Sequence, residues 1–233
     1  MRVLVVEDQT DVGETLVDFL VELGHQPLLV RSAEAALGTL GTQRPDTIIL
    51  DMHLPGMSGL EFLRLRPVRE SGVPIVAVSG VATESQAREC LRLGAIDFVA
   101  KPTPLERLKD VLAYLEPYAR ERRRAPQGQR ANRRRSFRAA IELAVRVVEY
   151  NGSDWETASV DLSPFGIKLR AVPGVTPGHA ARVAFTPADG GPELRLMSLL
   201  VRTDTAEHSF HFVNVTESEF QRLSRFVQGC PAS

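Results

Sequence analysis

Acidic residues follow two apolar runs in the first half of the chain, a placement that suits chemistry better than packing. Glu7 and Asp8 come soon after residues 2–6, and Asp51 comes directly after residues 46–50. Clustered carboxylates repel one another, and a hard divalent cation such as Mg²⁺ relieves this repulsion because it prefers oxygen ligands. An ionised carboxylate can also attack a phosphoryl group as a nucleophile. The pattern indicates a phosphorylation site at Asp51 with Mg²⁺ beside it.

A hydroxyl and an amine follow two later apolar runs. Ser79 comes after residues 73–78, with Gly80 beside it, and Lys101 comes after residues 96–100. A lysine can stabilise the negative charge of a transferring phosphoryl group. A serine hydroxyl can donate a hydrogen bond to a phosphoryl oxygen, and Gly80 leaves room for that group. We therefore expect Lys101 and Ser79 to complete the site.

Short apolar runs alternate with amphipathic stretches over residues 1–118. The runs are rich in Val, Ile and Leu without polar alternation, which is typical of strands buried on both faces. Such β-α units in a row predict a parallel sheet with helices on both faces. Because ligands bind beyond the carboxyl ends of these strands, the polar residues named above should meet at one edge. The expected strands are 2–6, 26–30, 46–50, 73–78 and 96–100.

Two expected helices carry specific end signals. Thr83 and Gln86 form a capping-box pair at the start of one helix, and Gly94 is a natural end for it. Thr103 is the expected cap of a later helix, with Pro104 at its first position.

Four short segments resemble the receiver domains of two-component response regulators, and they occur in the same order as in that family. The resemblance covers about half of the chain and implies a flavodoxin-like fold, a doubly wound five-stranded parallel sheet. The segments are Val6-Glu7-Asp8, Asp51-Met52-His53-Leu54-Pro55-Gly56-Met57-Ser58-Gly59, Val78-Ser79-Gly80 and Phe98-Val99-Ala100-Lys101-Pro102.

The resemblance also implies roles for individual residues. Asp51 is the phospho-acceptor for a histidine kinase or phosphotransfer protein, and Ser79 and Lys101 are the other catalytic residues. Ser79 and Phe98 occupy the switch positions. A receiver catalyses only its own phosphotransfer and dephosphorylation, so we expect no other enzymatic activity. The implied ligands of Mg²⁺ are Glu7, Asp8, Asp51 and the backbone carbonyl of His53.

An aspartate-nucleophile phosphatase is the rival enzyme reading of Asp51. Enzymes of that class carry an Asp-x-Asp motif, in which the second aspartate protonates the leaving group. Here His53 stands at the second position, and the chain lacks the inserted cap that such enzymes usually carry. The receiver reading is therefore favoured.

Positive charge is concentrated in one short segment of the 233-residue chain. Residues 120–138 hold nine arginines and one glutamate, so this segment carries +8 and the rest of the chain carries −9. Such blocks often contact anions. A solvated helix end followed by a linker would have the same composition, so the charge alone leaves both readings open.

Cysteine usage and hydropathy indicate a cytoplasmic protein, and the resemblance to response regulators implies a bacterial one. Cys90 and Cys230 lie far apart, with no metal-ligand spacing and no disulfide pattern. No apolar run approaches the ~18 residues of a membrane-spanning helix. We expect no membrane insertion.

The second half of the chain has a different pattern. Residues 119–133 predict a basic helix end and a linker, between a first domain at 1–118 and a second at 134–230. Short strand-like runs separated by turn residues then predict a small barrel or a sandwich, and residues 216–229 predict a closing helix. The expected strands are 140–150, 155–160, 167–172, 181–186, 194–203 and 209–215.

Two groups of residues in this half could recognise a nucleotide. Arg134 and Arg138 precede the first strand, and arginine can hydrogen-bond the O6/N7 edge of guanine and stack on a purine ring. Asp161, at a strand-turn-strand junction, can accept from guanine N–H groups. Ser163 can bond a backbone or ligand oxygen, and Gly166 permits a turn that a side chain would block.

These residues resemble the PilZ domain, a family of small antiparallel β-barrels with a C-terminal helix that bind cyclic di-GMP. Arg134 and Arg138 match its Arg-x-x-x-Arg motif, and Asp161, Ser163 and Gly166 match its Asp/Asn-x-Ser-x-x-Gly motif. Nonspecific binding of nucleic acid, which needs little more than phosphate charge, is a sharper alternative for the arginines. Binding of a single strand by base stacking is disfavoured, because the domain has few aromatic side chains and Trp155 is the only tryptophan. Further arginines near the motif that could contact the ligand are Arg130, Arg133 and Arg135.

Together the motifs predict a response regulator, phosphorylated on Asp51, whose second domain binds cyclic di-GMP and acts as an adaptor through protein contacts. Ligand binding is expected to order residues 128–138 and to reorient the domains. Two alternatives stay open: an adaptor that binds no nucleotide, and a nucleic-acid-binding regulator. The cognate kinase, the downstream protein, the cellular process, the stoichiometry of the nucleotide, any coupling between the two inputs and the oligomeric state, including a homodimer, are not predicted.

Overall fold

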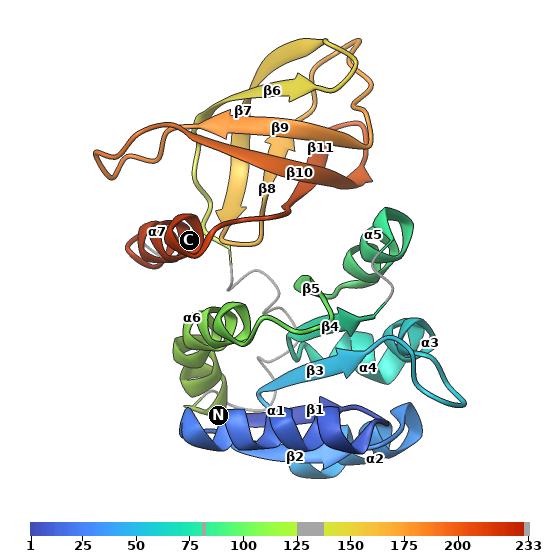
Figure 1. Cartoon of the computed structure of the whole chain (residues 1–233). Helices are drawn as coiled ribbons and strands as arrows, with labels where there is room; N and C mark the ends of the chain where they lie inside the picture. The colour runs from blue at the N-terminus through green and yellow to red at the C-terminus, as the bar shows by residue number, and fades with distance from the viewer. Residues whose placement is uncertain (81–82, 125–137, 231–233) are drawn as a thin grey trace. The chain divides into compact units, whose positions relative to one another are not determined.

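The computed structural model describes residues 1–80, 83–124 and 138–230 (Figure 1). The chain forms two compact units, Met1–Arg134 and Arg135–Ser233, and each is described by itself. Four arginines of the expected nucleotide site lie outside the described residues, as does most of the segment 128–138 whose ordering was predicted. They are Arg130, Arg133, Arg134 and Arg135.

The first unit contains a five-stranded parallel sheet, which confirms the doubly wound fold. The strand order is β2-β1-β3-β4-β5, so the order reverses between β1 and β3. The strands are β1 (Arg2–Val6), β2 (Gln26–Val30), β3 (Thr47–Asp51), β4 (Ile75–Ser79) and β5 (Asp97–Ala100). The helices are α1 (Thr10–Glu22), α2 (Ala33–Gln43), α3 (Gly59–Arg64), α4 (Arg66–Ser71), α5 (Glu84–Leu93) and α6 (Leu105–Arg124).

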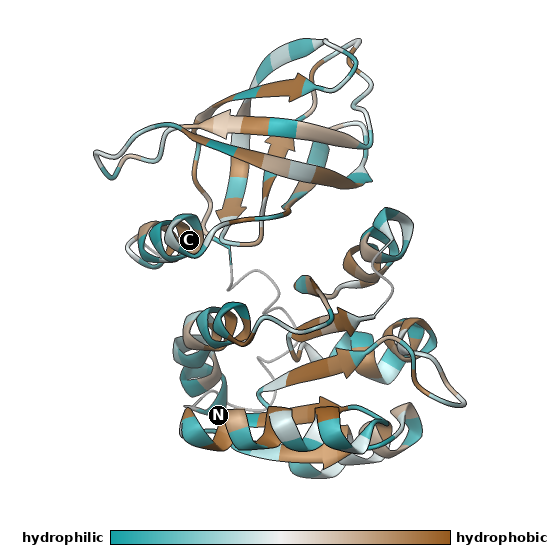
Figure 2. Cartoon of the chain, in the orientation of Figure 1, coloured by the Kyte–Doolittle hydropathy of each residue, from teal (hydrophilic) through white to brown (hydrophobic). Residues whose placement is uncertain are grey.

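Apolar residues fill both faces of this sheet. Val5 and Ile49 pack with Leu20 of α1 and Leu108 of α6 on one face. The other face carries a larger cluster around Phe62, to which α2, α3, α4 and α5 contribute. The strands β3 and β4 are hydrophobic apart from Thr47, Asp51 and Ser79 at their ends (Figure 2). Burial of these runs holds the strand ends, and the polar residues on them, in fixed positions.

Strand β2 corrects the expectation that all five strands are buried on both faces. Gln26 is exposed and the other four residues are only half-buried. The reason is its place at the sheet edge, where β1 is its one strand neighbour.

The helix ends follow the predicted signals in part. Thr83 accepts a hydrogen bond from the backbone N–H of Gln86, and Gly94 ends α5 in the left-handed conformation with a φ of 110°. The reciprocal half of the capping box is not formed, because the buried Oε1 of Gln86 has no hydrogen-bond partner among the described residues. Helix α6 begins at Leu105, so Pro104 lies just before it and not at its first position.

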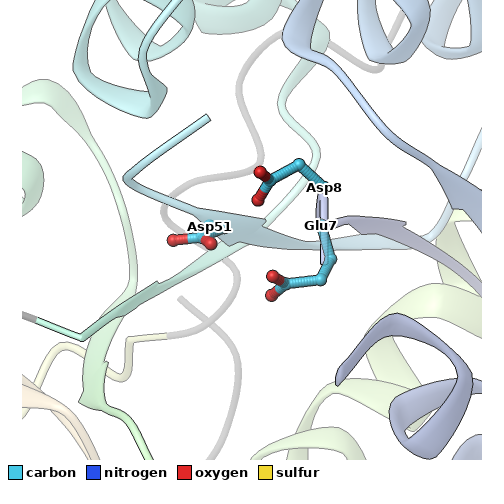
Figure 3. Close-up of side chains that lie close together, drawn as sticks. All are labelled: Glu7, Asp8 and Asp51. Carbon is cyan, nitrogen blue, oxygen red and sulfur yellow. The ribbon is translucent and has the colours of Figure 1, made fainter. Parts of the chain in front are cut away.

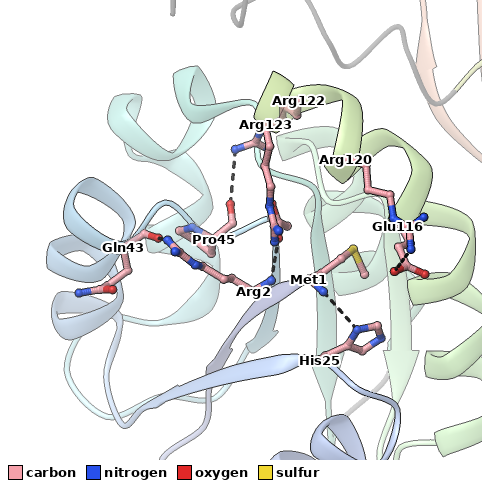
Figure 4. A network of polar contacts seen from close by, with 10 residues as sticks. Met1, Arg2, His25, Gln43, Pro45, Glu116, Arg120, Arg122 and Arg123 are labelled. Atoms are coloured by element: carbon pink, nitrogen blue, oxygen red, sulfur yellow. Dashed lines mark hydrogen bonds and ion pairs between the residues drawn. The ribbon is translucent and has the colours of Figure 1, made fainter. Parts of the chain in front are cut away.

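Arginines near the end of α6 anchor this helix to the unit (Figure 4). Arg123 forms an ion pair with buried Asp46, and its Nε lies 3.1 Å from Asp46 Oδ1. Arg122 donates to the carbonyls of Gly72 and Pro45, at 3.2 and 3.4 Å. These two side chains therefore bind groups of their own unit, which neither reading of the basic segment described.

The second unit is a closed antiparallel barrel, so the barrel and not the sandwich is formed. The strand order around it is β10-β11-β8-β7-β6-β9. Helix α7 (Glu217–Gln228) packs against the end of the barrel where β7 ends, and Phe220 lies 5.5 Å from Phe165 between ring centroids (Figure 1). The strands are β6 (Ala144–Glu149), β7 (Asp154–Ser163), β8 (Gly166–Arg170), β9 (Ala180–Phe185), β10 (Leu194–Thr203) and β11 (Glu207–Phe212).

Strand β7 is longer than expected and contains a bulge. It runs to Ser163, and β8 begins at Gly166 after a turn at residues 164 and 165, which confirms the expected strand-turn-strand junction. Asp161 itself lies within β7. Ser159 pairs with Leu169 of β8, and Asp161 pairs with the next residue, Lys168. Val160 is therefore the extra residue of a bulge. Without it Asp161 would alternate to the inner face, and with it Asp161 shares the outer face of the barrel with Lys168.

Candidate functional sites

Three carboxylates converge at the carboxyl edge of the parallel sheet (Figure 3). Glu7 and Asp8 follow β1, and Asp51 ends the adjacent strand β3. One oxygen from each side chain lies within 4.8 Å of the others. The structure thus brings together the three acidic side chains that the sequence singled out.

Lys101 neutralises part of this acidic group. Its Nζ lies 2.7 Å from Asp51 Oδ2, and 3.0 and 2.8 Å from the two oxygens of Glu7. Burial lowers the pKa of Lys101, but its hydrogen bonds to Asp51 and Glu7 outweigh burial, so the pKa lies above its ordinary value. Burial raises the pKa of Glu7, the hydrogen bond from Lys101 opposes this, and the charge of Asp51 adds to it. Lys101 is therefore a firmly charged ammonium inside the site.

Asp8 meets the requirement of a cation ligand. Its Oδ1 is buried and has no hydrogen-bond partner among the described residues. A buried carboxylate oxygen without a partner is costly, and a hard divalent cation with oxygen ligands would satisfy it. The residues present therefore fit Mg²⁺.

The imidazole of His53 is a contact that sequence reasoning missed, because only its backbone carbonyl was assigned. The backbone N–H of His53 donates to Asp51 Oδ1 at 3.0 Å. Its Nδ1 lies 3.3 Å from the hydroxyl of Ser79, which is fully buried. A Cβ on Gly80 would meet no atom within 4 Å, in line with the expected room beside Ser79. Phe98, the other expected switch residue, is half-buried on β5, opposite Ala77 of β4.

Gly59 fixes the loop that follows Asp51. A Cβ on Gly59 would lie 2.7 Å from the carbonyl oxygen of Asp51, so only glycine fits. Ser58 caps the helix α3 that begins there, in a capping box with Glu61. The close approach holds the loop against the end of β3. The sequence alone does not predict this contact, because a glycine that is needed for close packing looks the same as one that is needed for a turn.

The second expected site lies on the outer face of the barrel. Arg138 forms an ion pair with Asp161, and its Nη2 donates to the carbonyl of Gly166 at 3.1 Å. The hydroxyl of buried Ser163 donates to the same carbonyl at 3.2 Å. The described members of the arginine and aspartate motifs therefore meet at one place.

Comparison with known families decides what these two units are. The model of the response regulator receiver domain matches residues 3–113, and the model of the PilZ domain matches residues 132–229. The chain joins a receiver domain to a PilZ domain. The receiver domain places it among two-component response regulators.

The curated relatives match about half of this chain. The sensory/regulatory protein RpfC of Xanthomonas campestris pv. campestris is 37% identical over 125 residues, covering 52% of this chain and 17% of RpfC. The response regulator protein FleR of Pseudomonas aeruginosa is 36% identical, covering 48% of this chain and 24% of FleR. The chain thus spans a minor part of these relatives. A solved response regulator receiver protein from Pseudomonas putida is 31% identical, covers 48% of this chain and 94% of its own, and has a TM-score of 0.46.

Gly166 of the PilZ domain is required for a reason other than the one expected. The prediction was a turn that a side chain would block. The structure shows instead a close approach of strands, because a Cβ on Gly166 would lie 2.2 Å from the carbonyl oxygen of Phe210 on β11. Gly166 is therefore needed for barrel closure.

Lys168 is a residue of the PilZ domain that sequence reasoning missed. Its Nζ lies 3.4 Å from Asp161 Oδ2 and 3.1 Å from Glu207 Oε2. The sequence alone does not place Lys168 beside Asp161, because their pairing depends on the bulge in β7.

No helix among the described residues is long and apolar enough to cross a membrane.

Proposed function

We propose that this response regulator is phosphorylated on Asp51, and that its PilZ domain binds cyclic di-GMP and acts on a downstream protein through direct contacts. The convergence of Glu7, Asp8, Asp51 and Lys101 at one sheet edge carries the first part. The convergence of Arg138 with Asp161 supports the second. The phosphodonor is a histidine kinase or a phosphotransfer protein, as the receiver domain implies.

Asp51 is the nucleophile of the proposed phosphotransfer. A carboxylate oxygen of Asp51 forms the bond to phosphorus while the bond from phosphorus to the donor histidine nitrogen breaks, and that nitrogen keeps the electron pair. The Lys101 ammonium, 2.7 Å from Asp51 Oδ2, stabilises the negative charge on the carboxylate and on the arriving group. The backbone N–H of His53 holds the other oxygen, Oδ1.

Glu7, Asp8, Asp51 and the backbone carbonyl of His53 are the proposed ligands of Mg²⁺. The bound ion supplies positive charge that neutralises the transferring phosphoryl group. Asp8 contributes the buried oxygen that has no other partner among the described residues.

Ser79 and Phe98 are the proposed switch residues. The Ser79 hydroxyl, 3.3 Å from His53 Nδ1, can turn to donate to a phosphoryl oxygen on Asp51. Phe98 lies on the neighbouring strand β5, opposite Ala77 of β4, and Ser79 lies two residues further along β4, opposite Ala100. A rearrangement of Ser79 would therefore act on the strand that carries Phe98.

Phosphorylation is tested on the full chain with phosphoramidate and Mg²⁺, followed by intact-mass measurement. The wild type should gain one phosphoryl group and Asp51→Asn none. Asp18→Asn, at an exposed position of α1, is the matched control and should behave as the wild type. Equal labelling of Asp51→Asn and wild type would show that Asp51 is not the phospho-acceptor.

Cyclic di-GMP binding is tested by calorimetry on the full chain. Arg138→Ala and Arg134→Ala should lose the heat of binding. Arg195→Ala is the control, because Arg195 pairs with Glu193 on β10 and is largely exposed. No heat with the wild type would favour the adaptor that binds no nucleotide. Salt-dependent binding of DNA without a preference for cyclic di-GMP would favour the nucleic-acid-binding regulator.

A further inference from the structure

Charges of alternating sign cross the outer face of three barrel strands. Arg138 pairs with Asp161 of β7, and Lys168 of β8 lies between Asp161 and Glu207 of β11. The bulge at Val160 is what turns Asp161 to this face. Bulges often re-aim a side chain next to a functional site.

Lys168 differs from Arg138 in how it is held. Arg138 is fixed by Asp161 and by the carbonyl of Gly166. Lys168 has two carboxylate partners among the described residues, and its side chain is 31% exposed. An ammonium has three N–H donors. At least one donor of Lys168 can therefore reach a ligand that lies against Asp161.

We propose that Lys168 donates to O6 of a guanine base whose N–H groups are held by Asp161, and so makes the PilZ domain select guanine over adenine. The inference rests on the proposed binding of cyclic di-GMP. Lys168 lies outside the arginine and aspartate motifs and would be a specificity-determining residue.

The chemistry of the two bases supports this role. Guanine carries an acceptor, O6, and a donor amino group at N2, whereas adenine carries a donor amino group at N6. A carboxylate beside an ammonium, 3.4 Å apart here, presents an acceptor and a donor side by side, as guanine requires. Adenine would set its N6 amino group against the Lys168 ammonium, donor to donor. Buried or partly buried polar groups left unpaired in this way reject the wrong ligand strongly.

The simpler reading is that Lys168 only neutralises Asp161 and Glu207. The two readings differ in what happens when the ammonium is removed. If Lys168 reads the base, its loss weakens the binding of cyclic di-GMP and does not weaken the binding of cyclic di-AMP, because it removes the donor that opposes the N6 amino group of adenine. If it only neutralises carboxylates, its loss affects both dinucleotides alike, or frees Asp161 and strengthens binding.

The test is calorimetry on the full chain with cyclic di-GMP and cyclic di-AMP. Lys168→Met should lower the affinity for cyclic di-GMP by about 10- to 100-fold, the range for one well-made pair of base contacts. Arg170→Met is the matched control: Arg170 lies two residues along β8 on the same face and pairs with Glu142. It should change the affinity less than about threefold, because Arg170 is exposed and pairs with Glu142 and not with Asp161, and such surface ion pairs contribute little.

Lys168→Met binding cyclic di-GMP within about threefold of the wild type, or more tightly, would overturn the proposal, because the expected pair of contacts is worth more than that. An equal loss for both dinucleotides, or an equal loss in Arg170→Met, would also overturn it. A wild-type chain that binds no cyclic di-GMP would instead overturn the proposed function on which the inference rests. Circular dichroism of each variant confirms that the barrel is intact.

Discussion

Lys101 Nζ lies 2.7 Å from Asp51 Oδ2 and 2.8 Å from Glu7 Oε2, so a single ammonium bridges the two carboxylates at the ends of adjacent strands. Both carboxylates are buried. Removing one partner of a buried ion pair leaves an uncompensated charge. Lys101 is thus placed both to hold the acidic group together and to stabilise charge during phosphotransfer.

Replacing Lys101 should slow phosphorylation of Asp51. Lys101→Met removes the ammonium next to the nucleophile, and we expect the rate with phosphoramidate to fall by about 100-fold, as for loss of one preorganised donor. The rate is followed by intact mass against time. Lys109→Met, which removes a half-exposed lysine paired with Glu106, is the control. An unchanged rate in a folded Lys101→Met protein would show that the ammonium does not assist the transfer.

Magnesium should stabilise the receiver domain through Asp8. At a free Mg²⁺ concentration 100 times the dissociation constant, the gain in unfolding free energy is about 2.7 kcal/mol. Asp8→Asn should abolish the gain and, without Mg²⁺, should be at least as stable as the wild type because one of three clustered charges is gone. Urea unfolding with and without Mg²⁺ measures both effects. A full Mg²⁺ response in Asp8→Asn would contradict the assigned ligand set.

Gly166→Ala should destabilise the PilZ barrel. The added Cβ would lie 2.2 Å from the Phe210 carbonyl oxygen, so β8 and β11 must move apart. We expect a cost of about 1–3 kcal/mol, as for other overpacked positions. Gly41→Ala in α2, where a Cβ would meet nothing within 4 Å, should instead stabilise its helix by up to about 1 kcal/mol. Thermal unfolding of the two variants should shift in opposite directions.

The ion pair between Asp189 and Arg222 should make stability depend on pH in the acid range. The hydrogen bonds from Arg222 lower the pKa of Asp189 from 3.8 to about 2. Because the folded-state pKa is lowered, the pair contributes fully above the unfolded-state value of 3.8, and its contribution is lost as the pH falls toward about 2. Arg222→Met should cost about 1 kcal/mol at neutral pH. The difference from wild type should shrink in urea titrations as the pH falls below 3.8, and a constant difference would refute the pairing.

The fold was predictable because each half of the chain has a clear hydrophobic period. Unbroken Val/Ile/Leu runs indicate a parallel sheet, and short strands with turn residues indicate a barrel or sandwich. The meeting of Glu7, Asp8, Asp51 and Lys101 followed from one rule, that the carboxyl ends of parallel strands share an edge. The edge strand β2 was misjudged, since its apolar sequence does not reveal which strand lies outermost.

The remaining features of the two sites depend on strand register and on close contacts between backbone segments. The type of a single residue does not predict either of them. The bulge at Val160 decides that Asp161 faces outward beside Lys168. The approach of Gly166 to Phe210 depends on barrel closure. The contact of His53 with Ser79 joins the loop after β3 to the end of β4, 26 residues away in the sequence. The boundaries of the domains and the roles of Arg130, Arg133, Arg134 and Arg135 stay predictions.

Peptide mass spectrometry of the phosphorylated chain tests the central claim most directly. After phosphorylation by a histidine kinase or by phosphoramidate in Mg²⁺, the modification should map to the peptide that contains Asp51, and it should be absent without Mg²⁺. Modification on another residue, or full modification of Asp51 in the absence of Mg²⁺, would contradict the account.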